Sequence, residues 1–208
     1  MKIDDLKYVI ETEDKSDFVI RINDDKNKFL CDPELYSDSI IIKVYGGNSL
    51  KEKYKKIGVI MGRYFRLSKL KYDLFEDIFD CVDQENHELY TDLYDENTEI
   101  NDKYVGLKRN IFHIEKFYIE EEYRNMGLGS KILIHLDDVL SLNINCEVGA
   151  YILKPNTIKK DKNDDLTSIE DKVLYKRLVD FYKRFGFKKI ESSDYMFINT
   201  DYISKMTS

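Results

Sequence analysis

The chain has 208 residues, of which 42% are hydrophobic and 35% charged, a composition typical of one globular domain with a buried core. Its formal net charge of −7 argues against a nucleic-acid surface, because phosphate backbones demand basic patches, and is compatible with a cationic amine partner. Three widely spaced cysteines (Cys31, Cys81 and Cys146), three histidines, and the lack of a signal peptide or membrane-length apolar run lead us to expect a cytoplasmic protein without metal or membrane contacts.

The first part of the chain carries strand patterns separated by charged turns. Alternating apolar residues at 18–22 predict a first strand, whereas residues 1–16 offer only a short element. Residues 39–45 predict a second strand that is closed by Gly46 and Gly47. Residues 58–65 follow a charged stretch and predict its partner strand.

A helical insertion is expected at about 68–100. Residues 70–82 place six apolar side chains on one face of a helix. The acidic segment 83–102 follows, with Leu89 and Leu93 among its apolar anchors. Two interpretations stay open, because charge runs are usually solvated faces: a packed insertion, or an acidic wall for a basic acceptor.

A strand, a glycine turn and a helix follow one another at residues 112–140. Phe112, Ile114, Phe117 and Ile119 predict the strand. The turn is Arg124-x-x-Gly127-x-Gly129, and the helix after it has apolar residues at three- and four-residue steps from Leu128 onward. The first N–H groups of such a helix have no intrahelical partner, and the helix dipole adds about half a positive charge there. Glycines leave that backbone open, so we expect a ligand that carries phosphates.

Two familiar phosphate-binding motifs fit this turn poorly. A P-loop places Lys directly after its second glycine, but here Gly129 is followed by Ser130 and only then by Lys131. A dinucleotide-binding fingerprint needs a third glycine where this chain has Ile132.

The C-terminal part alternates strand, loop, helix and hairpin. Residues 144–153 predict a strand, and residues 154–167 a polar, mobile loop. A capping box, Thr167-x-x-Glu170, predicts the start of a helix that ends at Gly186 in a left-handed conformation. Residues 187–190 and 195–198 predict a closing hairpin whose exposed edge would permit a homodimer.

The turn Arg124-x-x-Gly127-x-Gly129 after a hydrophobic strand resembles the acetyl-CoA pyrophosphate loop of the GNAT superfamily of N-acetyltransferases. Leu178-Val-Asp-Phe-Tyr-Lys-Arg-Phe-Gly-Phe187 resembles a late helix of the same superfamily, and the two matches occur in the right order. The resemblance implies a single GNAT-like domain over residues 1–208. Its substrate-side half would span 18–109 and its acetyl-CoA-binding core 110–200.

The fold implied is α/β (α+β), with a mixed, mostly antiparallel central sheet flanked by helices. Its fourth and fifth strands would splay apart and free backbone groups for the acetyl and pantetheine parts of acetyl-CoA. By the same resemblance, Phe117, Tyr118 and Ile119 would supply those groups. The pyrophosphate would contact the turn residues Arg124, Asn125, Met126, Gly127, Leu128, Gly129 and Ser130.

The resemblance also implies catalytic residues. Tyr182 matches the tyrosine that protonates the departing thiolate, and a phenol with a reference pKa of about 10 is a plausible donor. Three residues are candidates for the base that deprotonates the amine: Glu147, His113 and Glu115. A chain of water molecules in place of a direct base stays open.

The function implied is N-acetyl transfer from acetyl-CoA to a primary amine of a small molecule or protein, by direct attack in a ternary complex. The alternative is a catalytically silent acyl-CoA-binding sensor or interaction module of the same fold. A more distant alternative is a structural protein with a coincidental glycine turn. The acceptor, and whether the acyl group is acetyl or longer, stay open.

Overall fold

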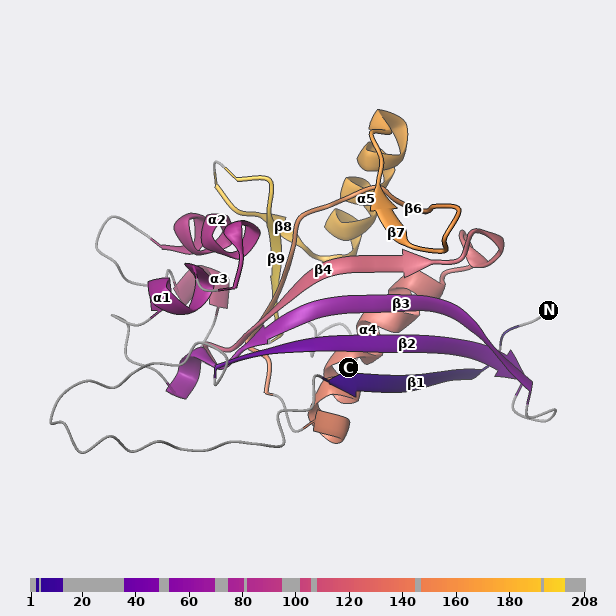
Figure 1. Ribbon diagram of the computed structural model, residues 1–208, viewed down its shortest axis with the longest axis horizontal. Coiled ribbons are helices and arrows are strands. Elements are labelled where there is room, and N and C mark those ends of the chain that lie inside the picture. The colour runs from indigo at the N-terminus through magenta and orange to yellow at the C-terminus, as the bar shows by residue number, and fades with distance from the viewer. Residues whose placement is uncertain are drawn as a thin grey trace, which may run out of the picture.

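The computed structural model describes residues 3, 5–12, 36–48, 53–69, 75–80, 82–94, 102–105, 108–144, 147–191 and 193–200. Within these residues, seven strands form one sheet in the order β1-β2-β3-β4-β5-β9-β8, and β6 and β7 form a separate pair (Figure 1). Every neighbouring pair in the large sheet is antiparallel except β4 and β5, which run parallel. The expected fold class, a mixed and mostly antiparallel sheet flanked by helices, is confirmed.

The N-terminal side of the sheet is a meander of long strands. β1 (Asp5–Thr12) pairs with β2 (Ser37–Asn48), which pairs with β3 (Lys53–Phe65). Ile40, Ile42 and Val44 alternate along β2 and are fully buried, as a half-covered strand requires. The strand expected at residues 18–22 lies outside the described residues, as do the three cysteines.

The insertion after β3 folds as short helices on one face of the sheet (Figure 1). They are α1 (Phe75–Asp80), α2 (Gln84–Leu93) and α3 (Asp102–Val105), preceded by a single helical turn at Leu67–Lys69. The helix expected at 70–82 is thus seen over 75–80, and a second helix begins where Asp83 caps it. Ile111 of β4 packs with this layer, whereas Phe112 packs with the opposite one.

The opposite layer is built on α4 (Leu128–Ile144), which follows β4 (Ile111–Ile119) through a helical turn at Glu121–Tyr123. Ile132, Leu136 and Leu140 of α4 are buried against the sheet. Because α4 continues to Ile144, the expectation of a strand from residue 144 was wrong, and β5 covers only Ala150–Leu153.

The segment expected as a mobile loop instead forms the antiparallel pair β6 (Ile158–Lys160) and β7 (Leu166–Ser168). The predicted capping box was wrong for the same reason, since Thr167 belongs to β7. Helix α5 (Lys172–Phe185) is capped by Asp171, whose side chain accepts from the N–H groups of Val173 and Leu174.

The end of the chain follows the prediction. Gly186 ends α5 with φ 109° in the left-handed region, as expected. The predicted hairpin forms from β8 (Lys188–Lys189) and β9 (Met196–Asn199), and β8 is an edge of the sheet. None of the helices in the described ranges is long and apolar enough to span a membrane.

Candidate active site

The centre of the sheet opens where β4 and β5 part. The two strands pair over Ile111–Ile114 and Ala150–Leu153, after which β5 ends and β4 continues to Ile119. On its other side β4 stays paired with β3 up to Ile119. Among the described residues no strand pairs with the second edge of residues 115–119. Backbone hydrogen-bonding groups on that edge are therefore available to a ligand.

The direction of these groups follows from two hydrogen bonds. Glu120 N donates a hydrogen bond to Ile57 O of β3 at 2.9 Å. The backbone N–H and C=O groups of even-numbered residues at this end of β4 therefore point toward β3. Ile119 O accepts from Arg124 Nε at 2.8 Å, on the other side. Because hydrogen-bonding direction alternates along a strand, the backbone groups of Phe117 and Ile119 face the open edge, while those of Tyr118 face β3.

A β-bulge lies beside this edge. Met61 pairs with Lys116 and Gly62 with Ile114, so Glu115 is an extra residue on β4. A Cβ at Gly62 would lie 2.4 Å from His113 O, so only glycine allows the strands to approach here. Beyond the bulge, Phe117 and Ile119 pack toward α4, and Tyr118 packs on the opposite face with Ile158.

The glycine turn joins β4 to α4 through two residues in the left-handed conformation. Asn125 has φ 61° and Gly127 φ 74°, two left-handed residues just before Leu128 starts a 17-residue helix. A Cβ at Gly127 would meet nothing within 4 Å, so the turn is open on that side. Gly129 serves packing instead, because its Cβ would come within 3.2 Å of Phe181 Cζ on α5.

Arg124 holds the turn against the end of β4. Besides its hydrogen bond to Ile119 O, its guanidinium carbon lies 5.2 Å from the centre of the Tyr118 ring. Lys160 Nζ lies 5.8 Å from the same ring and pairs with Glu120 at 2.7 Å and Asp164 at 2.8 Å. The turn and the β6–β7 pair are therefore fixed to one aromatic side chain.

Tyr182 lies on α5, the helix that packs on the glycine turn through Phe181. Its side chain is buried, with its ring 5.4 Å from that of Phe187. Burial raises the pKa of Tyr182 above its ordinary value, because the phenolate would be poorly solvated there. The phenol therefore stays protonated at neutral pH and can donate a proton.

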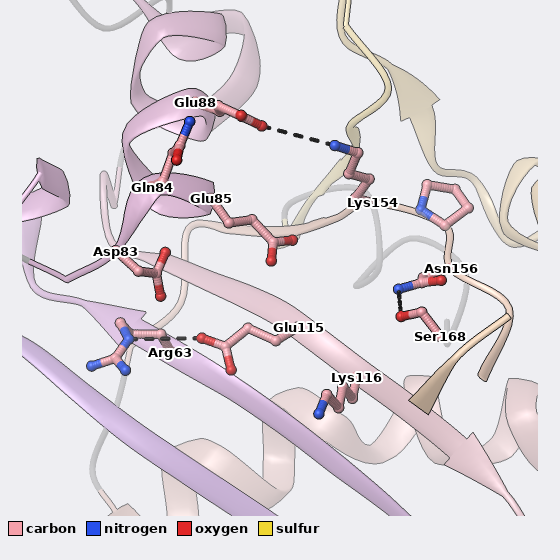
Figure 2. Close-up of a pocket in the computed structure, with 11 residues that line it drawn as sticks. Arg63, Asp83, Gln84, Glu85, Glu88, Glu115, Lys116, Lys154, Asn156 and Ser168 are labelled. Atoms are coloured by element: carbon pink, nitrogen blue, oxygen red, sulfur yellow. Dashed lines mark hydrogen bonds and ion pairs between the residues drawn. The ribbon is translucent and has the colours of Figure 1, made fainter. Parts of the chain in front are cut away.

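A cavity of about 750 Å³ lies on the face of the sheet that carries α2 and the β6–β7 pair (Figure 2). Its floor comes from β3 and β4, one wall from the start of α2, and the other from the chain after β5 together with β7. It is lined by Arg63, Asp83, Gln84, Glu85, Glu88, Glu115, Lys116, Lys154, Pro155, Asn156 and Ser168. Because Glu115 and Lys154 directly follow the last β4–β5 pair, the cavity adjoins the point where the strands part.

Two carboxylates of this cavity, Glu115 and Glu85, have raised pKa values. Burial raises the pKa of Glu115, and Arg63, whose Nε lies 3.7 Å from Glu115 Oε1, opposes that shift. Desolvation also raises the pKa of Glu85, and the like charge of Asp83 adds to it. A carboxylate whose pKa is raised toward neutrality is a better proton acceptor than an ordinary surface carboxylate.

His113 lies beneath the floor of the cavity. It is fully buried, and burial lowers its pKa to about 4, so it is neutral at pH 7. Nδ1 therefore donates to Asn86 Oδ1 at 2.9 Å, and Asn86 Nδ2 donates to Asp83 Oδ1 at 2.8 Å. His113 Nε2 is buried and has no hydrogen-bond partner among the described residues. The geometry gives His113 a structural link to α2 and no direct access to a substrate.

Glu147 lies away from this cavity. It is exposed and precedes β5, and its backbone carbonyl accepts from Asn110 Nδ2 at 2.8 Å. Asn110 precedes the first residue of β4, so roughly 15 Å of strand separates Glu147 from Glu115. Of the three candidate bases, only Glu115 lines the cavity.

Sequence reasoning placed the strand edge, the glycine turn and Tyr182, but it did not identify Glu85 or Asn86. The only local signal for α2 is Asp83 three residues before Asn86, a helix-capping spacing followed by the buried Leu89 and Leu93. That signal predicts a helix start and says nothing of the sheet face on which the helix lies.

Comparison with known proteins gives similarities of structure only. No family model and no curated protein sequence matches the chain. The structure is similar to AtaTR bound with acetyl-CoA, with 10% identity, a TM-score of 0.42, and coverage of 82% of this chain and 75% of that one. It is similar to the KacTA–DNA complex with 11% identity, a TM-score of 0.44, and coverage of 97% and 98%.

A third similar structure is AtaT complexed with acetyl-methionyl-tRNAfMet, with 12% identity, a TM-score of 0.37, and coverage of 84% and 77%. Identities and TM-scores this low carry no argument about activity.

The buried, neutral His113 predicts a pH dependence of stability. Its folded pKa of about 4 lies below the unfolded value of about 6.5, so the unfolded state binds the proton first as pH falls. We expect the free energy of unfolding to fall between about pH 6.5 and pH 4, by up to about 3 kcal/mol. Urea unfolding across this range measures it.

The His113→Gln variant should lose most of this pH dependence, whereas the control His135→Gln, exposed on α4, should keep it. Equal slopes for both variants would contradict the assignment to His113.

Proposed function

We propose that this chain is a GNAT-type N-acyltransferase that moves an acetyl group from acetyl-CoA to a primary amine by direct attack in a ternary complex. One observation carries the proposal: β4 loses its partner β5 after Ile114, and beyond the helical turn Glu121–Tyr123 a left-handed glycine turn opens α4. An open strand edge suits an extended amide-bearing arm, and a helix start suits a pyrophosphate. Acetyl-CoA carries both groups in that order.

In this proposal the cofactor is held mainly by backbone. Phe117 offers its N–H and C=O, and Ile119 its N–H, to the pantetheine arm, with Tyr118 bracing the strand between them, because Ile119 O already accepts from Arg124. The pyrophosphate lies on the N–H groups of residues 125–130, to which Ser130 adds a hydroxyl. Arg124 keeps the turn in place through Ile119 O and the Tyr118 ring.

The chemistry divides between two sides of the sheet. The amine nitrogen attacks the thioester carbonyl carbon, the C–S bond breaks, and the thiolate leaves. Tyr182, which burial keeps protonated by raising its pKa, donates its phenolic proton to the departing sulfur, and the second proton that the nitrogen loses as the amide forms restores the phenol through water. Glu115 takes the proton of the acceptor ammonium, directly or through water, because it lines the cavity and its pKa is raised. His113 and Glu147 have no direct part in this scheme.

A second candidate acceptor is an amine carried by a nucleic acid, such as an aminoacyl-tRNA. One observation favours it, a hollow of about 500 Å³ on α5 lined by Arg177, Asp180, Lys183 and Arg184. Cationic side chains on an exposed helix face suit contacts with phosphate groups. The overall net charge of −7 opposes such binding. The acceptor screen should therefore include an aminoacyl-tRNA beside small amines and a peptide.

Thermal unfolding tests cofactor binding. Acetyl-CoA or CoA at a hundred times its Kd should stabilise the fold by about 2.7 kcal/mol, a Tm rise of roughly 5–10 °C, whereas NAD and ATP should not. Ser130→Asp should abolish the shift, because it places a negative charge at the pyrophosphate site. It should not lower the Tm of the free protein, since an acidic residue stabilises a helix start. Ser130→Asn is the neutral control, and a full shift in Ser130→Asp would contradict the placement.

Tyr182→Phe tests catalysis separately from binding. We expect the rate of CoA thiol release to fall by about 10²–10⁴-fold, as for the loss of a general acid, with an unchanged acetyl-CoA thermal shift. Tyr175→Phe, an exposed tyrosine on the same helix, is the matched control and should keep its rate. A fully active Tyr182→Phe protein would refute the acid role. Acetyl-CoA binding without turnover of any amine would favour a silent binding module.

A further inference from the structure

The cations of the cavity beside β4 are already engaged. Arg63 Nε lies 3.7 Å from Glu115, and Lys154 Nζ lies 3.9 Å from Glu88. Lys116 Nζ donates to the backbone carbonyl of Leu166 at 3.4 Å. The lining therefore holds four carboxylates, Asp83, Glu85, Glu88 and Glu115, against these three cations.

Two carboxylates of the cavity form no ion pair among the described residues. Within the described ranges, the side chain of Asp83 accepts hydrogen bonds only from Asn86, and neither Asp83 nor Glu85 forms an ion pair. Figure 2 shows Glu85 reaching from α2 into the space above Glu115 on β4. Desolvation and the like charge of Asp83 raise the pKa of Glu85, and the positive charges of Lys154 and Lys116 oppose that shift only in part. A bound cation would relieve that repulsion.

His113, beneath the floor of the cavity, has a ring nitrogen to which no described residue donates a hydrogen bond. His113 projects to the same face of β4 as Glu115, two residues on, and pairs across the sheet with Arg63, which also lines the cavity. The buried Nε2 of this neutral ring has no partner among the described residues. His113 does not line the cavity, but the lone pair of Nε2 adds negative potential beneath its floor and so favours a positively charged occupant above it.

The arrangement suits an organic cation better than a metal ion. In the described part of the chain, no three His, Cys, Asp or Glu residues come close enough to hold a metal. The free carboxylates lie on the α2 wall, while Glu115 lies on the β4 floor. Carboxylates spread over two surfaces match charges spaced along a flexible molecule.

We infer that the acceptor is a flexible alkyl amine with at least two cationic nitrogens. This inference rests on the proposed function. The reacting amine lies by Glu115, next to the open edge of β4, and a second ammonium lies between Asp83 and Glu85. An amine that also carries a carboxylate is disfavoured, because it brings a further negative charge toward Asp83 and Glu85.

Three amines of equal chain length test this: 1,5-diaminopentane, lysine and pentylamine, assayed by CoA thiol release with acetyl-CoA. A charge-assisted hydrogen bond to a second ammonium should raise kcat/KM for 1,5-diaminopentane roughly 10- to 100-fold above pentylamine. Lysine, which differs from the diamine by one carboxylate, should be the poorer substrate of the two. Equal use of lysine and the diamine, or turnover of an aminoacyl-tRNA or a peptide alone, would overturn the inference.

Glu85→Gln locates the second ammonium. The ratio of kcat/KM for diamine over pentylamine should fall about tenfold or more, through KM for the diamine. Glu76→Gln, exposed on α1 of the same insertion, is the matched control and should keep the wild-type ratio. An unchanged ratio in Glu85→Gln would refute the role of Glu85.

The acetyl-CoA thermal shift separates two failures. If the wild-type protein shows no shift, the proposed function fails. If the shift is present in wild type and Glu85→Gln while the diamine has no advantage, only the inference about the acceptor fails.

Discussion

The candidate site depends on one buried chain of hydrogen bonds, from Asp83 through Asn86 to His113. It joins the start of α2 to the middle of β4, two segments that are distant in sequence. A buried imidazole and a buried amide would each cost free energy without a partner, so the two groups hold each other in place. Through this link, α2 is fixed above the bulge in β4, and its acidic first turn becomes one wall of the cavity.

The bulge at Glu115 changes which residues of β4 face α4. Before it, even-numbered residues such as Phe112 pack on the α4 side; after it, odd-numbered residues such as Phe117 do. The extra residue leaves Glu115 and the following Lys116 both lining the cavity. The last residue of β4 that pairs with β5 is Ile114, directly before Glu115, so the open edge of β4 begins at the bulge. The bulge and the end of β5 thus place the carboxylate proposed as proton acceptor beside the open backbone edge.

Local patterns predicted the local features of this fold. The end of α5 at Gly186, the closing hairpin and the turn before α4 each follow from a few neighbouring residues. The start of α5 was mispredicted because Thr167 pairs with Lys159 in a strand, and tertiary pairing overrode a capping motif. The burial of His113 and the position of Glu85 could not be predicted, since both depend on where α2 folds back onto the sheet.

In the proposed reaction, β4 presents its backbone to the acyl donor and its side chains to the acceptor. The edge groups of Phe117 and Ile119 are the same whatever side chains the strand carries, whereas Glu115 and the residues of α2 are set by sequence. Mutation can therefore alter acceptor choice without disturbing the donor site. Such a strand lets one acyl-transfer scaffold diversify its substrates through changes in a short insertion, while its chemistry is inherited unchanged.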